Sequence, residues 1–61
     1  MTIEELKNLD NEVVTEEQAN EVETDENVTG FENLGESTSH PGCYWIDVTL
    51  ADGTHIDIFT K

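Results

Sequence analysis

Two runs of alternating apolar and polar residues meet at a glycine in CYWIDVTLADGTHIDIFTK, residues 43–61. Alternation of this kind is typical of β-strands that bury one face. The residues between the runs, Ala51-Asp52-Gly53, suit a three-residue hairpin loop, in which a glycine in the left-handed region forms a bulge. The stretch therefore predicts a β-hairpin.

The length of the loop determines the register of this hairpin. A three-residue loop pairs Val48 with Ile56 and Ile46 with Ile58, and it places every apolar alternate on one face. A two-residue turn would instead put Val48 opposite Asp57. Because a one-residue slip exchanges the two faces of a strand, burial favours the bulged register.

The other face of the hairpin is predicted to carry an aromatic pair, Trp45 beside Phe59, and an acidic pair, Asp47 beside Asp57. Like charges directly opposite each other destabilise a sheet by about 0.2–1 kcal/mol, much as an aromatic pair stabilises it. Two interpretations of the acidic pair stay open. It is either a solvated face where water and salt screen the repulsion, or a patch that binds a cation or a basic partner.

Two short helices are predicted before the hairpin. The patterns T-x-x-E at Thr2 and T-x-x-Q at Thr15 are capping boxes, so we expect helices over about residues 3–9 and 16–22. Ala19 and Val22 are the only apolar contacts of the second helix, which predicts that it is weak.

A third strand is predicted over residues 28–34, with Gly30 as a bulge or bend. A further element is needed because a two-stranded hairpin is only marginally stable alone. Val13 and Val14 fit either a short strand or a hydrophobic staple for the next helix. The expected fold is α+β: one or two short N-terminal helices packed on a small antiparallel sheet that ends in the C-terminal hairpin.

Length and composition predict a single domain, residues 1–61, near the lower size limit for a domain without disulfides or metal. The single cysteine, Cys43, excludes an internal disulfide. The N-terminus lacks the basic and apolar segments of a signal peptide, and no apolar run is long enough for a membrane span. These features predict a cytoplasmic protein.

The formal net charge of −13 is the strongest functional signal, and it is unevenly distributed. Residues 1–36 contain twelve acidic residues and one lysine, so this segment is expected to be helical or partly disordered. A chain of this charge repels DNA, RNA and anionic lipid, and it is attracted to basic surfaces.

The sequence does not predict an enzyme, a cofactor site or a metal site. His40 and Cys43 have the spacing of one zinc-ligand pair, but structural zinc needs four ligands, and the predicted pairing puts Cys43 on the face opposite His55. Cys43 with a histidine also lacks a third group that would orient a thiol nucleophile.

The acidic residues predict instead a protein that binds by charge mimicry. Spaced carboxylates on a small scaffold can imitate phosphates and occupy the cationic groove of a nucleic-acid-binding enzyme. Exposed aromatic residues would add the apolar anchor that charge lacks. The predicted partner-binding residues are Glu16, Glu17, Glu21, Glu23, Asp25, Glu26, Trp45, Asp47, Asp57 and Phe59.

The chain resembles the small acidic DNA-mimic inhibitors encoded by phages, of the uracil-DNA glycosylase inhibitor type. The similar features are DENV at residues 25–28, then Trp45 with an alternating strand, the glycine turn at residues 52–53 and a final alternating strand. The Glu-Ser-Ile strand edge of that family has only Glu36-Ser37-Thr38 as a counterpart. The resemblance implies acidic helices followed by an antiparallel hairpin, and inhibition in the style of anti-restriction or anti-CRISPR proteins.

Three further interpretations stay open. The acidity can serve solubility alone. The chain can be a partly disordered adaptor or regulatory protein whose acidic half folds on a basic partner. It can also be a precursor peptide, with an acidic leader for a modifying enzyme and a C-terminal core rich in Thr, Ser and Cys43.

Overall fold

The C-terminal hairpin forms in the bulged register. In the computed structural model, which describes residues 1–61, β3 (Tyr44–Leu50) and β4 (His55–Thr60) pair antiparallel, with Val48 opposite Ile56 and Ile46 opposite Ile58. Gly53 has a φ of 89°, in the left-handed region that a non-glycine residue rarely adopts. The predicted hairpin and its register are confirmed.

The third strand, β2 (Val28–Glu36), pairs antiparallel with β3 and extends two residues beyond the predicted end. Its register shifts between Val28 and Gly30, which confirms the predicted bulge, and again between Asn33 and Gly35. A Cβ atom at Gly30 would lie 3.0 Å from Oγ1 of Thr49. Glycine therefore lets β2 approach β3 at this point.

A fourth strand makes the sheet mixed rather than purely antiparallel. β1 (Glu12–Val14) pairs parallel with β4, with Val13 opposite Phe59, and the strand order is β1-β4-β3-β2. Of the two alternatives for Val13 and Val14, the strand is the one that forms.

Both capping boxes form at the starts of the helices. α1 (Ile3–Lys7) begins after Thr2, and α2 (Glu16–Glu23) begins after Thr15, each with reciprocal hydrogen bonds to the third helical residue. α1 ends two residues earlier than predicted, because the N–H groups of Leu9 and Asp10 bond to carbonyls three residues back and turn the chain.

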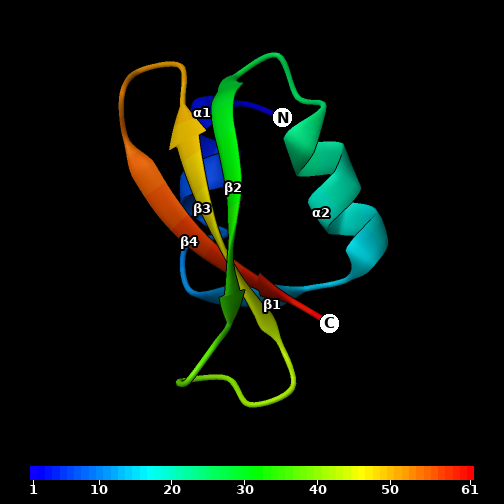
Figure 1. The fold of residues 1–61 in the computed structure, drawn as a ribbon. Helices are drawn as coiled ribbons and strands as arrows, with labels where there is room; N and C mark the ends of the chain where they lie inside the picture. Colours follow the sequence, from blue (N-terminus) through cyan, green and yellow to red (C-terminus); the bar gives the residue numbers. More distant parts are fainter.

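The helices and the sheet share one core. In Figure 1, α2 packs beside β2, and α1 lies behind β3 and β4. Side chains from one face of the sheet meet those of both helices, in a cluster formed by Leu6, Val14, Ala19, Val22, Ile46, Val48, Leu50, Ile56 and Ile58. The predicted α+β class is confirmed, and the segment 1–36 contributes α1, β1, α2 and β2 to it.

None of the helices is both long and apolar enough to cross a membrane.

Candidate functional site

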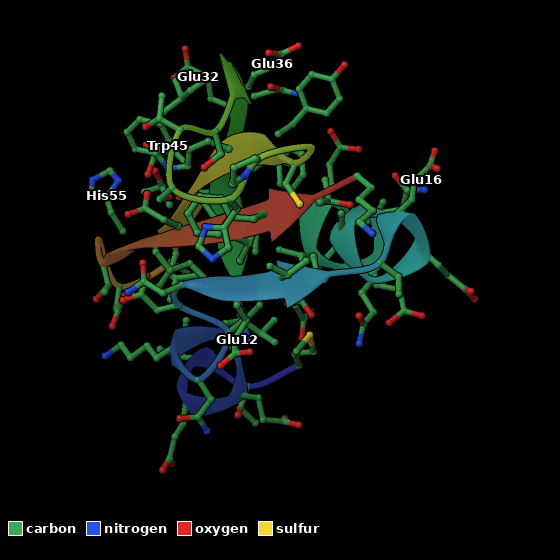
Figure 2. All side chains as sticks on the ribbon, turned by 90° about the horizontal axis from the view of Figure 1, so that it is seen from below. Glu12, Glu16, Glu32, Glu36, Trp45 and His55 are labelled. Carbon is green, nitrogen blue, oxygen red and sulfur yellow. The ribbon has the colours of Figure 1, made fainter.

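The face of the sheet opposite the core forms the first candidate surface. We call it the outer face, and it consists of Trp45, Asp47 and Thr49 on β3, His55, Asp57 and Phe59 on β4, Glu32 on β2 and Val13 on β1. Figure 2 shows Trp45 and His55 on the side of the sheet opposite α2. Neither helix covers this face.

A row of three carboxylates crosses the outer face. Glu32 lies opposite Asp47, and Asp47 lies opposite Asp57, so three neighbouring strands each contribute one acid. Glu32 is exposed, and the two aspartates are half-buried. Like charges in directly opposed positions destabilise a sheet. This arrangement therefore works against the stability of the fold.

Neutral and titratable partners contact the two aspartates, but no lysine does. The indole Nε1 of Trp45 donates a hydrogen bond to Oδ1 of Asp57 at 3.0 Å. Nδ1 of His55 lies 3.1 Å from the hydroxyl of Thr49 and 3.7 Å from Oδ2 of Asp47. These contacts orient the carboxylates, and none of them comes from the permanent positive charge of a lysine or arginine.

The backbone around Asp57 is held by the turn that precedes β1. The N–H of Asp57 donates to Oδ1 of Asp10 at 2.9 Å, and its carbonyl accepts from the N–H of Asn11 at 2.7 Å. Asn11 has a φ of 65°, a conformation that asparagine tolerates better than most residues. The position of the Asp57 carboxylate on the outer face is therefore fixed from two sides.

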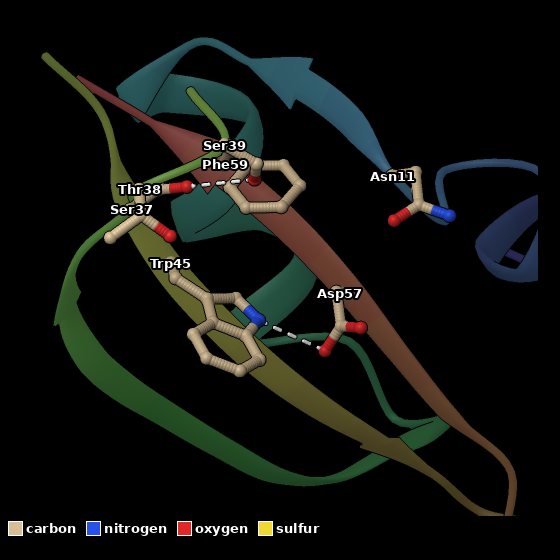
Figure 3. A pocket seen from close by; sticks show the side chains of 7 residues that line it. All are labelled: Asn11, Ser37, Thr38, Ser39, Trp45, Asp57 and Phe59. Atoms are coloured by element: carbon tan, nitrogen blue, oxygen red, sulfur yellow. Dashed lines mark hydrogen bonds between the residues drawn. The ribbon is translucent and has the colours of Figure 1, made fainter. Parts of the chain in front are cut away.

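A pocket of about 270 Å³ opens between the outer face and the loop that joins β2 to β3. In Figure 3 the carboxylate of Asp57 lies between the indole of Trp45 and the amide of Asn11. The pocket combines an acid, aromatic rings and hydroxyl groups, and its lining residues are Asn11, Ser37, Thr38, Ser39, Trp45, Asp57 and Phe59.

The loop covers one of the two predicted aromatic anchors. The ring of His40 stacks on Phe59 with the ring centroids 4.0 Å apart, and Phe59 is only 5 % exposed. Trp45 remains 40 % exposed. Of the two aromatic side chains predicted for the outer face, Trp45 is therefore exposed and Phe59 is covered.

The predicted acidic residues of the helix form a second candidate surface. We call it the α2 acidic surface, and it consists of the exposed side chains of Glu16, Glu17, Glu21 and Glu23. Figure 2 places Glu16 on the other side of the sheet from Trp45. The structure thus divides the predicted binding residues between two surfaces and does not bring them into one patch.

The remaining two predicted residues follow α2. Glu26 is exposed, whereas Asp25 is half-buried and forms an ion pair with the N-terminal ammonium group of Met1 at 2.7 Å. This hydrogen bond and a second one from the N–H of Asn27 lower the pKa of Asp25. Asp25 therefore contributes to the fold, and of the two only Glu26 has a carboxylate without a partner in the protein.

Most acidic side chains have no partner within the protein. Lys7 pairs with Asp52 at 3.1 Å, and no carboxylate lies within ion-pair distance of Lys61. Nine exposed glutamates have side chains that form neither a hydrogen bond nor an ion pair: Glu4, Glu12, Glu16, Glu17, Glu21, Glu23, Glu26, Glu32 and Glu36.

The sequence did not predict that Glu32 belongs to the outer face. Its place depends on the register of β2, which is shifted by two irregularities. The pocket residues Asn11 and Ser37 to Ser39 were also not predicted, because they lie in loops without a periodic pattern.

No group of three or more His, Cys, Asp or Glu side chains is arranged to hold a metal ion. His40 is stacked on Phe59, and Cys43 is buried with a free thiol.

Comparisons with models of protein families, with curated protein sequences and with solved structures found no match for this chain.

Proposed function

We propose that this protein is a non-enzymatic inhibitor that acts in the cytoplasm by occupying the basic surface of a nucleic-acid-handling protein. The observation that carries the proposal is the set of nine exposed glutamates without a partner on a compact folded scaffold. Carboxylates carried on a folded scaffold can replace the phosphates that such a surface normally neutralises.

The placement of the charges favours binding over solubility as their role. In α2, Glu17 and Glu21 are four residues apart on one helix face, and no basic residue lies in the last turn. Like charges at this spacing destabilise a helix, and the C-terminal end lacks the cation that would stabilise it. On the outer face the carboxylate row has the same effect. Local rules of stability are expected to be broken at functional sites.

The shape of the protein suits a partner with a groove. The α2 acidic surface and the outer face lie on opposite sides of the sheet, so a flat partner contacts one of them and a groove contacts both. The extents of the molecule are 29, 20 and 17 Å, and its narrow dimensions are comparable to the width of a DNA duplex. A groove that encloses duplex can therefore enclose this protein.

The proposed mode of action is that of the phage-encoded uracil-DNA glycosylase inhibitors, which the sequence resembles.

Capture from a bacterial lysate tests the proposal. The protein is immobilised, the lysate is treated with nuclease, and bound proteins are eluted first with duplex DNA and then with salt. We expect the DNA to release a basic nucleic-acid-binding protein, because both ligands compete for one cationic surface. We also expect the inhibitor itself to have no affinity for DNA.

Two variants of equal charge serve as a matched pair in this capture. One has Glu16, Glu17 and Glu21 of the α2 acidic surface changed to Gln, and the other has Glu4, Glu12 and Glu36 changed to Gln, outside both candidate surfaces. The first should lose much more of the captured protein than the second, because its three glutamates lie together on one surface. If the captured protein stays bound when duplex DNA is added, the proposal is contradicted.

A further inference from the structure

The pocket beside Trp45 contains a carboxylate that lacks a cationic partner. Oδ1 of Asp57 accepts the hydrogen bond from Trp45, and no hydrogen bond or ion pair reaches Oδ2. The two lysines do not compensate, because Lys7 pairs with Asp52 and Lys61 pairs with no carboxylate. A half-buried carboxylate in a pocket gains more from a cation than a fully solvated one does, because water screens it less.

The walls of the pocket match a planar cation. The indole of Trp45 offers a π surface that attracts a cation, and the carboxylate of Asp57 accepts charge-assisted hydrogen bonds beside it. The hydroxyl of Thr38 and the amide oxygen of Asn11 are further acceptors on the rim. Guanidinium is the protein group that combines stacking with several donors in one plane.

The size of the pocket limits its occupant to one side chain. Sites for drug-sized ligands are usually about 300–1,000 Å³, and this pocket, at about 270 Å³, lies below that range. Its lining includes Trp45, Asp57 and Phe59 of the outer face, so an approaching protein can insert a residue from that side.

We propose that this pocket receives an arginine side chain of the partner protein, with the guanidinium group stacked on Trp45 and hydrogen-bonded to Asp57. The inference rests on the proposed function, since a surface that binds nucleic acid is rich in arginine. It adds a specific contact to an interaction that is otherwise a sum of distributed charges.

A titration with a model compound tests the pocket directly. Trp45 is the only tryptophan, so its indole N–H gives a single, assignable NMR signal at the wall of the pocket. The probe is N-acetyl-arginine amide at constant ionic strength, and the control is N-acetyl-citrulline amide, which has nearly the same shape without the charge. We expect a saturable shift of the indole signal with arginine and none with citrulline. This titration uses the wild-type protein. Equal shifts of the indole signal with both compounds, or no shift with either, would overturn the proposal.

Two variants test whether arginine binds in the pocket beside Asp57. Asp57→Asn keeps an oxygen that can accept from Trp45 but removes the charge, and it should weaken arginine binding by about fivefold. Glu4→Gln on α1 makes the same change in net charge away from the pocket and should leave the affinity unchanged. Equal weakening by both would show that arginine responds to net charge alone, against the proposal. N-acetyl-lysine amide should bind more weakly, because its ammonium group cannot stack as a plane.

The arginine titration and the capture experiment can fail independently of each other. If duplex DNA displaces a captured basic protein but arginine leaves the indole signal unchanged, the pocket proposal fails and charge mimicry stands. If arginine binds in the pocket but no captured protein competes with DNA, the pocket proposal stands and charge mimicry fails.

Discussion

At the scale of single residues, Thr60 has a buried hydroxyl group without a hydrogen-bond partner. An unsatisfied buried hydroxyl destabilises the folded state, and valine has nearly the same shape without the polar group. Thr60→Val should therefore raise the free energy of unfolding in urea by about 1 kcal/mol. Thr49→Val is the control, because the hydroxyl of Thr49 has a partner in His55 and its loss should bring no gain. A less stable Thr60→Val protein would show that the hydroxyl is satisfied in solution.

Substitutions of Gly53 test the backbone conformation of the hairpin loop. Its φ is 89°, and no atom beyond Gly53 and its two chain neighbours lies within 4 Å of the position that a Cβ would take, so a substitution here changes backbone strain and not packing. Gly53→Val should lower the free energy of unfolding by more than about 1 kcal/mol, because a β-branched residue resists the left-handed region. Gly53→Asn should lower it less, since asparagine tolerates that region. Equal losses in the two variants would mean that the loop adopts another conformation.

Asp52 gives the fold a predictable dependence on pH. Hydrogen bonds from the N–H of Thr54 and from the ammonium group of Lys7 lower its pKa to about 2, from 3.8. Because the pKa is lower in the folded state, this group stabilises the protein above about pH 4, and the contribution is lost as the pH falls toward 2.

Asp52→Asn isolates that contribution. The difference in unfolding free energy between the wild type and this variant should be larger at pH 5 than at pH 2, as measured by urea denaturation at each pH. A difference that is independent of pH would show that the carboxylate of Asp52 has no special environment in the folded state.

At the scale of elements, α2 should be less protected than the C-terminal hairpin. It buries only Ala19 and Val22, whereas β3 and β4 supply five of the nine residues of the core cluster. Local opening is easiest where few apolar contacts must be broken. We therefore predict faster amide exchange for residues 15–27 than for the hairpin, measured by NMR in D₂O. Equal protection in both regions would indicate that α2 opens only with the whole domain.

Elements defined by local patterns could be predicted from the sequence. The bulged hairpin follows from the alternation around Gly53, and both helix starts follow from capping boxes at Thr2 and Thr15. The parallel pairing of β1 could not be predicted, because three residues carry no clear period and their partners lie far away in the chain.

The candidate site was predictable only in part, for the same physical reason. The positions of Trp45, Asp47 and Asp57 depend on the hairpin, so their shared face was correctly predicted. Glu32 joins them through a strand with two register shifts, and Phe59 is covered by a loop residue, His40. Both outcomes depend on contacts between distant segments, which alternation within one strand does not encode.

At the scale of the whole molecule, the distribution of charge separates the roles of the acids. Asp25 and Asp52 are paired with cations and support the fold, whereas the unpartnered glutamates lie on its surface. Single exposed ion pairs are worth only about 0.2–1 kcal/mol, so no single glutamate should dominate binding. Charge mimicry therefore predicts that affinity depends on many carboxylates together.

The most direct measurement is the salt dependence of the dissociation constant for a captured partner. Between about 50 and 200 mM salt, the affinity of the wild type should fall steeply, because many ionic contacts form together. Changing Glu16, Glu17, Glu21 and Glu23 together to Gln should weaken binding far more than any single change and should reduce this slope. If the fourfold variant binds as tightly as the wild type with the same salt slope, charge mimicry through α2 is wrong, and the acidity serves solubility while the outer face alone forms the interface.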